Sequence, residues 1–325
     1  MTNRLQRTNP VSLRISVTDN CQLRCLYCRP AEEDDISQHS DLLTFDTIIN
    51  FVNFLNRHYQ LSKVHITGGE PLVRPGIVEL IKKLSAAGIG DIALTTNGQL
   101  LGKMAIPLKR AGLKRINISL DSLDTDNFHQ LTRGGELYRT LEGVEAAIKS
   151  GLSPVKLNTV VLRHSNDHEI VDIAGYGMER NCRVRFLELM PIGVSAAFFS
   201  DWFVSSDEVM KRLAEKFELS AVLGQSGSSS CNYRAYDSKG TAGIIGFISP
   251  YTAPFCSDCR RLRLTSNGRL FGCLARKESY EIGSLLRDDS LSDGASLLEV
   301  INSALTNKHS GSRFTTLDTI VKIGG

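Results

Sequence analysis

Strand-like and helix-like segments alternate six times along the first two thirds of the chain, and this alternation limits the folds it can adopt. The strand-like segments are short runs rich in Val, Ile and Leu, and apolar residues at helical spacing follow them. They lie at residues 13–17, 63–66, 91–95, 115–120, 155–161 and 183–189. Repeated β-α units build a parallel sheet with right-handed crossovers. The sequence therefore predicts an α/β protein, either a barrel or an open doubly wound sheet.

Chemically distinctive residues follow nearly every strand, and they separate these two alternatives. A doubly wound sheet collects its site at one switch point, whereas a barrel gathers loops from the carboxyl ends of all its strands. The distinctive segments are residues 21–28, 68–71, 96–98, 119–121 and 188–191, with Lys156 inside the fifth strand. We therefore predict an open six-unit (β/α) barrel over residues 1–200.

The pattern changes after the sixth strand. A capping box from Ser205 to Glu208 predicts one more helix, and residues 224–230 form a Gly/Ser-rich linker. Strand-like runs without intervening helices then follow at 233–236, 243–248, 262–265 and 270–271, and one late helix is predicted around 297–305. This predicts a second region, residues 201–325, that is a small antiparallel appendage to the barrel.

Three cysteines follow the first strand in Cys-x3-Cys-x2-Cys spacing: Cys21, Cys25 and Cys28. Thiolates this close together on a short loop indicate a thiophilic metal or cluster. A zinc site needs a fourth ligand, which would have to be a residue such as His39, Cys182 or Cys231 at an unusual spacing. A four-iron cluster held by three thiolates instead keeps one iron open for a small ligand.

A second triplet, Cys256, Cys259 and Cys273, lies in the predicted appendage. It could be half of a zinc ribbon with Cys231 as the fourth ligand, or a second iron-sulfur site. Alternation along a strand places Arg261 and Arg263 on one face, next to these cysteines. They are either a solvated basic strand or a pair of guanidiniums suited to a phosphate-bearing or purine substrate.

Composition narrows the cellular context. The net charge of +3 comes from 38 basic and 35 acidic residues, a balance that does not indicate a nucleic-acid surface. The N-terminus has no apolar signal segment, and the run at 243–248 is too short to span a membrane. Six of the eight cysteines fall in the two triplets, which is typical of metal binding in a reducing compartment. These features predict a cytoplasmic protein without nucleic-acid or membrane partners.

The first triplet, with Tyr27 before its last cysteine and Gly-Gly-Glu-Pro at 68–71, resembles the radical SAM superfamily. Over essentially the whole chain, the sequence further resembles the MoaA-type GTP 3′,8-cyclase family. The segments that carry this resemblance are 13–19, 21–28, 67–72, 117–123, 132–135, 155–158, 186–191, 255–259, 261–263 and the terminal Gly324 and Gly325.

The resemblance implies a mechanism and two [4Fe-4S] clusters. An external reductant loads the first cluster, S-adenosylmethionine (SAM) is split to a 5′-deoxyadenosyl radical, and the radical takes hydrogen from C3′ of GTP before C3′ bonds to C8. The implied ligands of the first cluster are Cys21, Cys25 and Cys28, and those of the second are Cys256, Cys259 and Cys273. The implied SAM-binding residues are Tyr27, Gly68, Gly69, Glu70, Ser119 and Met190.

The same resemblance assigns the substrate site. The implied GTP-binding residues are Arg14, His65, Thr96, Lys156, Arg261, Leu262 (through its backbone) and Arg263, and catalytic roles also fall to Arg261, Arg263, Gly324 and Gly325. His65 stands where the family usually has an arginine, with Lys63 nearby as a substitute cation. The implied partners are flavodoxin or ferredoxin as electron donor and cyclic pyranopterin monophosphate synthase downstream, and a homodimer is possible.

Two other functions fit parts of the pattern. A two-cluster radical SAM enzyme that modifies peptides would share both cysteine triplets but would not need Arg261, Arg263 or the Gly-Gly terminus. A non-enzymatic iron-sulfur or zinc scaffold would need only the cysteines. Formation of 5′-deoxyadenosine on reduction in the presence of SAM separates an enzyme from a scaffold.

Overall fold

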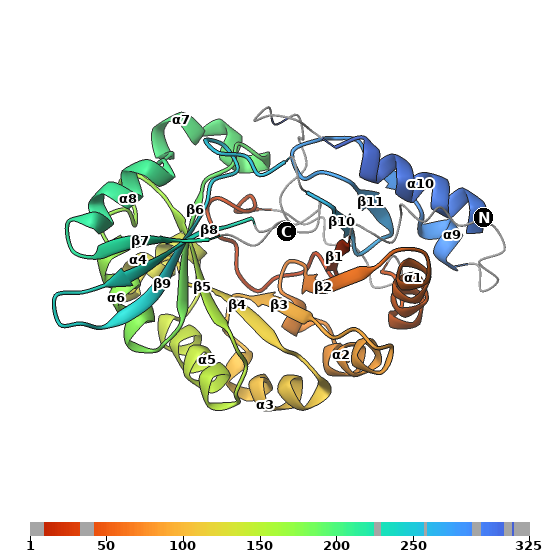
Figure 1. Ribbon diagram of the computed structural model, residues 1–325, viewed down its shortest axis with the longest axis horizontal. Helices are drawn as coiled ribbons and strands as arrows, with labels where there is room; N and C mark the ends of the chain where they lie inside the picture. Colours follow the sequence, from red (N-terminus) through yellow and green to blue (C-terminus); the bar gives the residue numbers. More distant parts are fainter. Residues whose placement is uncertain are drawn as a thin grey trace.

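The computed structural model describes residues 10–32, 42–223, 229–256, 259–287, 294–308 and Phe314. One twelve-stranded sheet runs through these residues, in the order β12-β11-β10-β1-β2-β3-β4-β5-β6-β9-β8-β7. Figure 1 shows the strands following an arc, with α1, α2, α3 and α5 on its outer side. The two predicted terminal glycines lie outside the described residues.

The six predicted β-α units are present. Their strands are β1 (Val11–Ser16), β2 (Leu61–Thr67), β3 (Ile92–Thr96), β4 (Arg115–Ser119), β5 (Val155–Val161) and β6 (Arg183–Glu188). The first three strands are followed by α1 (Phe45–His58), α2 (Ile77–Ala86) and α3 (Leu101–Ala111), with a 3-10 turn η3 (Pro71–Val73) before α2. Two helices, α4 (Thr125–Thr132) and α5 (Leu137–Lys149), follow β4, while α6 (Ile170–Glu179) follows β5 and α8 (Ser206–Ala214) follows β6. All neighbouring pairs from β1 to β6 are parallel. The α/β fold class is confirmed.

The C-terminal region divides between both edges of this sheet. One arm comprises β7 (Glu218–Val222), β8 (Cys231–Tyr236) and β9 (Ala242–Ile248), and β9 pairs in parallel with β6. The other comprises β10 (Arg261–Leu264), β11 (Arg269–Phe271) and β12 (Tyr280–Glu281), and β10 pairs in parallel with β1. The predicted antiparallel pairing is confirmed within each arm, but the sequence did not indicate that the two arms would lie at opposite edges.

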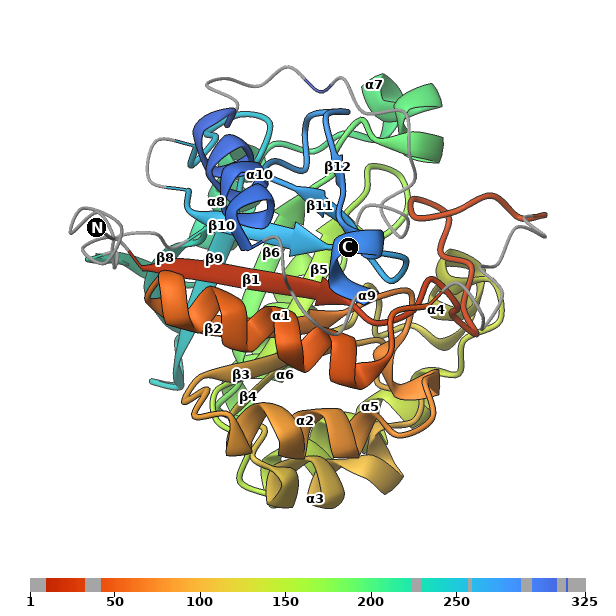
Figure 2. The same ribbon diagram turned by 90° about the vertical axis from the view of Figure 1, so that its right-hand side faces the viewer.

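Further helices complete the described chain. They are η4 (Gly193–Ala197), α7 (Phe199–Trp202), α9 (Gly283–Arg287) and α10 (Gly294–Thr306). Figure 2 shows β1 running beside α1, with β10 and β11 on its other side and α10 above them. None of the helices in the described ranges is long and apolar enough to cross a membrane.

Local sequence signals account for several element boundaries. The Thr44 hydroxyl accepts a hydrogen bond from Thr47 N at 3.1 Å and caps α1, as predicted. Ser205 caps α8 in the same way, with Glu208 N at 3.2 Å. The predicted capping box is incomplete, however, because the Glu208 carboxylate is bound by Arg163 and Arg212 instead. Gly151, with φ of 75°, follows the end of α5 as predicted.

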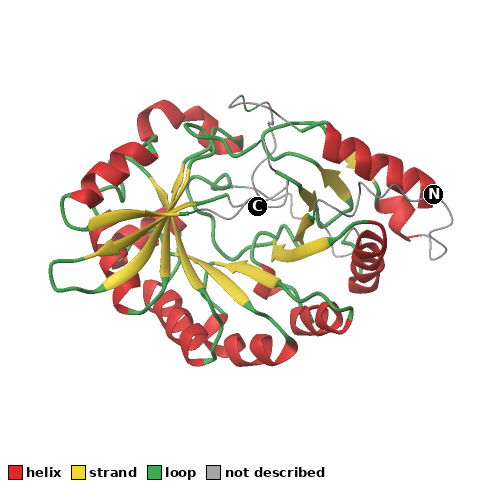
Figure 3. Ribbon diagram, viewed as in Figure 1, coloured by secondary structure: helices red, strands yellow, loops and turns green. Residues whose placement is uncertain are grey.

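The two faces of the sheet differ sharply in chemistry. One face packs against the helices in one main core. Figure 3 shows these helices in red outside the yellow strands. Its fully buried strand residues include Leu13, Ile15, Val64, Ile66, Ile92, Leu94, Ile116, Ile118, Leu157, Val184, Leu262 and Leu264. Because successive side chains in a strand point to opposite faces, the residues between them face the inner side of the arc. The core includes residues of both halves of the chain, and the division at residue 200 stays a prediction.

Candidate functional site

The first cysteine triplet lies on an ordered loop at the carboxyl end of β1. Cys25 O accepts hydrogen bonds from Cys28 N at 2.9 Å and from Arg29 N at 3.3 Å, which closes a tight turn. The loop is tied to the end of α4 because Arg24 N donates to Thr132 O and Leu26 N donates to Leu131 O. The three half-buried thiols are therefore presented together by backbone contacts.

The surroundings of these thiols fit an iron-sulfur cluster. Cys21 Sγ accepts hydrogen bonds from Leu23 N at 3.4 Å and from Asn97 Nδ2 at 3.7 Å, the kind of donors that stabilise cluster thiolates. Burial raises the pKa of Cys21 to about 11, and burial followed by the Cys28 and Asp121 charges raises the pKa of Cys25 well above its ordinary value. Such thiols become thiolates when a metal supplies the compensating positive charge.

The arrangement of possible ligands does not favour a single zinc ion at the first triplet. In the part of the chain that the structure describes, no three His, Cys, Asp or Glu side chains are arranged to hold a single metal ion. Cys182 is buried in the core and Cys231 is exposed on β8, so neither completes such a group; His39 lies outside the described residues. A four-iron cluster spans a larger volume than one ion and accepts thiolates set further apart.

The Gly-Gly-Glu-Pro segment packs directly on the entry to the cysteine loop. Gly69 N donates to Thr18 O at 2.7 Å and Glu70 N donates to Asn20 O at 2.8 Å. A Cβ atom at Gly68 would lie 2.4 Å from Thr18 O, and one at Gly69 would lie 2.4 Å from Asn20 O. The absence of side chains at Gly68 and Gly69 therefore lets two backbone segments meet, and their predicted contact with SAM stays a prediction.

Glu70 is fully enclosed by donors. Its carboxylate accepts hydrogen bonds from Leu72 N at 3.0 Å, Thr96 Oγ1 at 2.8 Å and Asn97 N at 2.7 Å. Burial raises its pKa to about 7 although these three donors favour the ionised form. Thr96 therefore lies beside the predicted SAM-binding residues, and its predicted contact with GTP stays a prediction.

Tyr27 ties the cysteine loop to the end of β4. Its hydroxyl donates to Asp121 Oδ2 at 2.6 Å, and Val160 N donates to Asp121 Oδ1 at 2.9 Å. Burial raises the pKa of Asp121 to about 6, against the effect of both hydrogen bonds. Ser119 lies half-buried at the carboxyl end of β4, and Met190 lies half-buried just after β6. The predicted SAM-binding residues thus all lie at carboxyl ends of strands.

Basic side chains line the inner face of the sheet. Arg14 is in register with Arg263 on one side and with His65 on the other. Two residues before Arg14 on β1, Ser12 is in register with Arg261 on β10 and with Lys63 on β2. The predicted substrate residues on β1, β2 and β10 therefore lie next to one another. Leu262, between the two arginines, points its side chain into the core on the opposite face, so only its backbone could reach a ligand.

The far side of the arc adds further cations. Lys156 on β5 is in register with Arg183 on β6, and Asn158 with Arg185. The sequence interpretation did not select Arg183, Arg185 or Arg115 as site residues. The available signal was the spacing of two between Arg183 and Arg185 on one strand, which places both on the inner face.

Crowding of positive charge shifts the titration of these groups. Burial, then the Arg263, Arg261 and Arg185 charges, lowers the pKa of Arg14. Burial, with Arg185 as the next largest cause, lowers the pKa of Lys156 to about 7. Burial, with Arg115 as the next cause, lowers the pKa of Lys63 to about 8. An anion bound on this face would relieve the repulsion, so the electrostatics favour a polyanionic ligand.

His65 is held in a polar network that crosses the inner face. Its Nε2 lies 2.7 Å from Thr95 Oγ1 and 3.2 Å from Asn117 Nδ2. Arg185 in turn donates to Asn117 Oδ1 at 2.8 Å and to Asn158 Oδ1 at 2.9 Å. Burial, then the charges of Arg14 and Lys63, lowers the pKa of His65 well below its ordinary value. His65 is thus a neutral side chain at neutral pH.

The second cysteine triplet lies at the opposite end of the β1–β10 pair. Cys256 and Cys259 precede β10, and Cys259 N donates to Cys256 O at 3.2 Å. Cys273 follows β11, whose antiparallel pairing with β10 returns the chain to the same end. Six residues at about 3.3 Å each give β1 a length of about 20 Å between the two ends. The basic inner face therefore lies between the two triplets.

The electrostatics of the second triplet differ from those of the first. Burial alone would raise the pKa of Cys259, but the Lys308 ammonium, the Arg261 backbone N–H and the guanidiniums of Arg261 and Arg263 lower it overall. A thiol whose ionised form is favoured in this way is a good ligand for iron. The donor set thus fits a cluster at this end as well.

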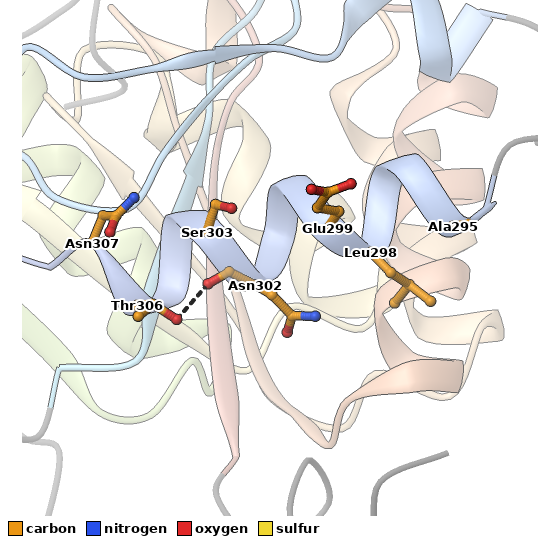
Figure 4. Close-up of a pocket in the computed structure, with 7 residues that line it drawn as sticks. All are labelled: Ala295, Leu298, Glu299, Asn302, Ser303, Thr306 and Asn307. Carbon is orange, nitrogen blue, oxygen red and sulfur yellow. Dashed lines mark hydrogen bonds between the residues drawn. The ribbon is translucent and has the colours of Figure 1, made fainter. Parts of the chain in front are cut away.

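A surface depression of about 590 Å³ lies elsewhere, along α10. Figure 4 shows its lining, in which Thr306 Oγ1 donates to Asn302 O at 2.8 Å. The lining residues are Ala295, Leu298, Glu299, Asn302, Ser303, Thr306 and Asn307. It contains no cysteine and no basic side chain, so it is separate from the site.

Comparisons with known proteins agree with this geometry. A family model described as the radical SAM superfamily matches residues 15–176, and one described as Molybdenum Cofactor Synthesis C matches residues 182–314. A GTP 3′,8-cyclase of Alkaliphilus oremlandii is 43% identical over 91% of this chain and 89% of its own length. A GTP 3′,8-cyclase of Peptoclostridium acidaminophilum is 41% identical over 96% of this chain and 95% of its own length.

Among solved structures, the chain resembles Streptococcus suis SuiB bound to S-adenosylmethionine, with a TM-score of 0.58 and 15% identity. The match covers 89% of this chain and 68% of SuiB. At this identity the likeness concerns the fold alone.

Proposed function

Because the chain belongs to the GTP 3′,8-cyclase family of the radical SAM superfamily, we propose that it converts GTP to (8S)-3′,8-cyclo-7,8-dihydroguanosine 5′-triphosphate. This is an early step of molybdenum cofactor biosynthesis. Beyond family membership, one observation supports the proposal most: the basic inner face of the sheet, which includes Arg14, Lys156, Arg261 and Arg263, lies between the two cysteine triplets.

Each end of the basic face takes a separate role in this proposal. Cys21, Cys25 and Cys28 would hold one [4Fe-4S] cluster, with Tyr27, Gly68, Gly69, Glu70, Ser119 and Met190 around SAM. Cys256, Cys259 and Cys273 would hold the second cluster, which binds the guanine end of the substrate. When bound, the first cluster supplies the electron that splits SAM into methionine and the 5′-deoxyadenosyl radical.

The protein side chains supply binding and orientation. Four or more cations on one face match a triphosphate, since guanidiniums bind phosphate oxygens in a bidentate fork. Arg261 and Arg263 are best placed to act near the second triplet, because β10 starts there. His65 and Thr96 would contribute neutral hydrogen bonds, and the backbone of Leu262 would contribute a further contact. Gly324 and Gly325, outside the described residues, are proposed to enter the site from the C-terminus.

Isotope transfer gives a direct test. The reconstituted protein, incubated anaerobically with dithionite, SAM and GTP deuterated at C3′, should form 5′-deoxyadenosine that carries one deuterium. A Cys256→Ser variant should lose this transfer. Formation of unlabelled 5′-deoxyadenosine alone would favour a radical SAM enzyme with another substrate, such as a peptide. No 5′-deoxyadenosine at all from a fully reconstituted sample would favour the scaffold function.

The remaining partners follow from the same proposal. A one-electron donor such as flavodoxin or ferredoxin would reduce the first cluster, and cyclic pyranopterin monophosphate synthase would consume the product. We place the reaction in the cytoplasm, where thiolate clusters stay reduced. A homodimer is compatible with the proposal but is not required by it.

A further inference from the structure

Lys308 connects the two backbone segments that carry the second cysteine triplet. Its Nζ donates to Arg261 O at 2.6 Å and to Gly272 O at 2.5 Å. Arg261 lies two residues after Cys259, and Gly272 lies directly before Cys273. One ammonium group therefore fixes the start of β10 relative to the end of β11.

Packing of α10 delivers this ammonium. The buried face of α10, which includes Leu297, Ile301 and Ala304, joins the main core. The end of the helix is in close contact with β11, because a Cβ atom at Gly272 would lie 2.0 Å from Ala304 O. Lys308 follows two residues after the helix ends and is half-buried. Its position is thus set by contacts on both sides.

The Lys308 ammonium group, held by Arg261 O and Gly272 O, lies beside the segments that carry Cys259 and Cys273, and its charge is opposite to that of their thiolates. The first triplet has charged neighbours of both signs, since Asp121 acts on Cys25, and both Glu70 and Arg29 act on Cys21. Positive charge close to an anionic iron-sulfur cluster favours its reduced form, which carries one more negative charge.

We infer that Lys308 is a positioning residue for the second cluster, which holds the Cys259 and Cys273 segments at a fixed spacing and makes that cluster easier to reduce. This inference rests on the proposed function, because it takes the second triplet as a cluster site. It assigns no contact between Lys308 and the substrate.

The test uses the full chain with Cys21, Cys25 and Cys28 all changed to Ser, so that iron binds at the second triplet alone. In this background, Lys308→Met removes the charge and Lys308→Arg keeps it. Lys103→Met, at an exposed position on α3, is the matched control. The midpoint potential is followed by EPR during a redox titration, and iron retention is followed during incubation with a chelator.

Lys308→Met should shift the midpoint potential to a more negative value and release iron several-fold faster than the parent. Lys308→Arg and Lys103→Met should keep parental values. Full iron with an unchanged potential in Lys308→Met would refute the electrostatic role, and unchanged release would refute the positioning role. A parent that binds no iron at the second triplet would instead refute the two-cluster proposal and this inference with it.

Discussion

Binding of GTP should take up protons from solution, and Lys156 should be the main group that accepts them. Its pKa lies at about 7 in the free site, because it is partly buried and surrounded by other cations. About half of the Lys156 side chains are therefore neutral at pH 7. A bound triphosphate stabilises the ammonium form and raises this pKa, so binding converts the neutral fraction to the charged one.

The magnitude follows from the two lysine pKa values. Lys156 should take up about 0.5 proton per GTP at pH 7 and about 0.9 at pH 8. Lys63, with a pKa of about 8, should add about 0.1 and about 0.5 proton at the same two pH values. Because the charged form binds, affinity should fall as pH rises, by about 16-fold between pH 7 and 8.5 from Lys156 alone. The terminal phosphate titrates near pH 6, so it can release about 0.1 proton at pH 7, which offsets the Lys63 contribution there, and it contributes about 0.01 at pH 8.

Isothermal titration calorimetry measures this uptake, since the observed enthalpy varies with the ionisation enthalpy of the buffer in proportion to the protons taken up. Lys156→Arg keeps a cation that does not titrate, so it should bind GTP while losing about 0.5 proton of uptake at pH 7. Lys103→Met should behave as the parent. Equal uptake by Lys156→Arg and the parent, or no uptake by the parent, would refute the assigned origin of the protons.

Three further changes probe other parts of the site. Gly69→Ala places a Cβ atom 2.4 Å from Asn20 O, so the cysteine loop must shift. Iron analysis should show that the first cluster is lost while the second is retained. Full iron content in this variant would contradict the packing of Gly69 on the loop. Tyr27→Phe removes the donor to the buried Asp121 carboxylate and should lower the free energy of unfolding by about 1–3 kcal/mol in urea titrations, whereas an unchanged midpoint would argue against the contact. Arg185→Met removes the donor to Asn117 and Asn158 and one inner-face charge, so it should weaken GTP binding by about 2 kcal/mol or more in calorimetry; parental affinity would show that Arg185 only supports the sheet.

The six β-α units were predictable because each strand and helix is specified locally. Leu13 and Ile15 alternate with polar residues on β1, and Thr44 caps the following helix, so the pattern of one short window is sufficient. The cysteine triplets were predictable for the same reason. Their spacing is local, and few other structures need three thiols so close together.

The gathering of cations was only partly predictable, since it depends on the register between strands. Lys156 and Arg183 become neighbours because β5 and β6 pair at these positions, and nothing in either strand alone indicates it. The placement of the C-terminal arms is equally non-local. The Glu188 carboxylate at the end of β6 accepts hydrogen bonds from Tyr251 N at 3.1 Å and Thr252 N at 3.0 Å. This contact anchors the segment that leaves β9 for the opposite edge of the sheet, and it appears in the sequence only as one carboxylate among many.

The same network decides the chemical state of His65. Arg185 has only N–H donors, so Asn117 must turn its oxygen toward Arg185 and its NH₂ group toward His65. The Nε2 atom of His65 is therefore an acceptor, and the ring carries its single proton on Nδ1. If the ring were protonated, its Nε2–H would face the NH₂ group of Asn117, and two donors would meet. This arrangement agrees with the lowered pKa of His65. At His65 the inner face thus carries a neutral ring whose tautomer is fixed through Asn117 by Arg185, while Lys63 and Arg185 maintain the positive field that a triphosphate requires.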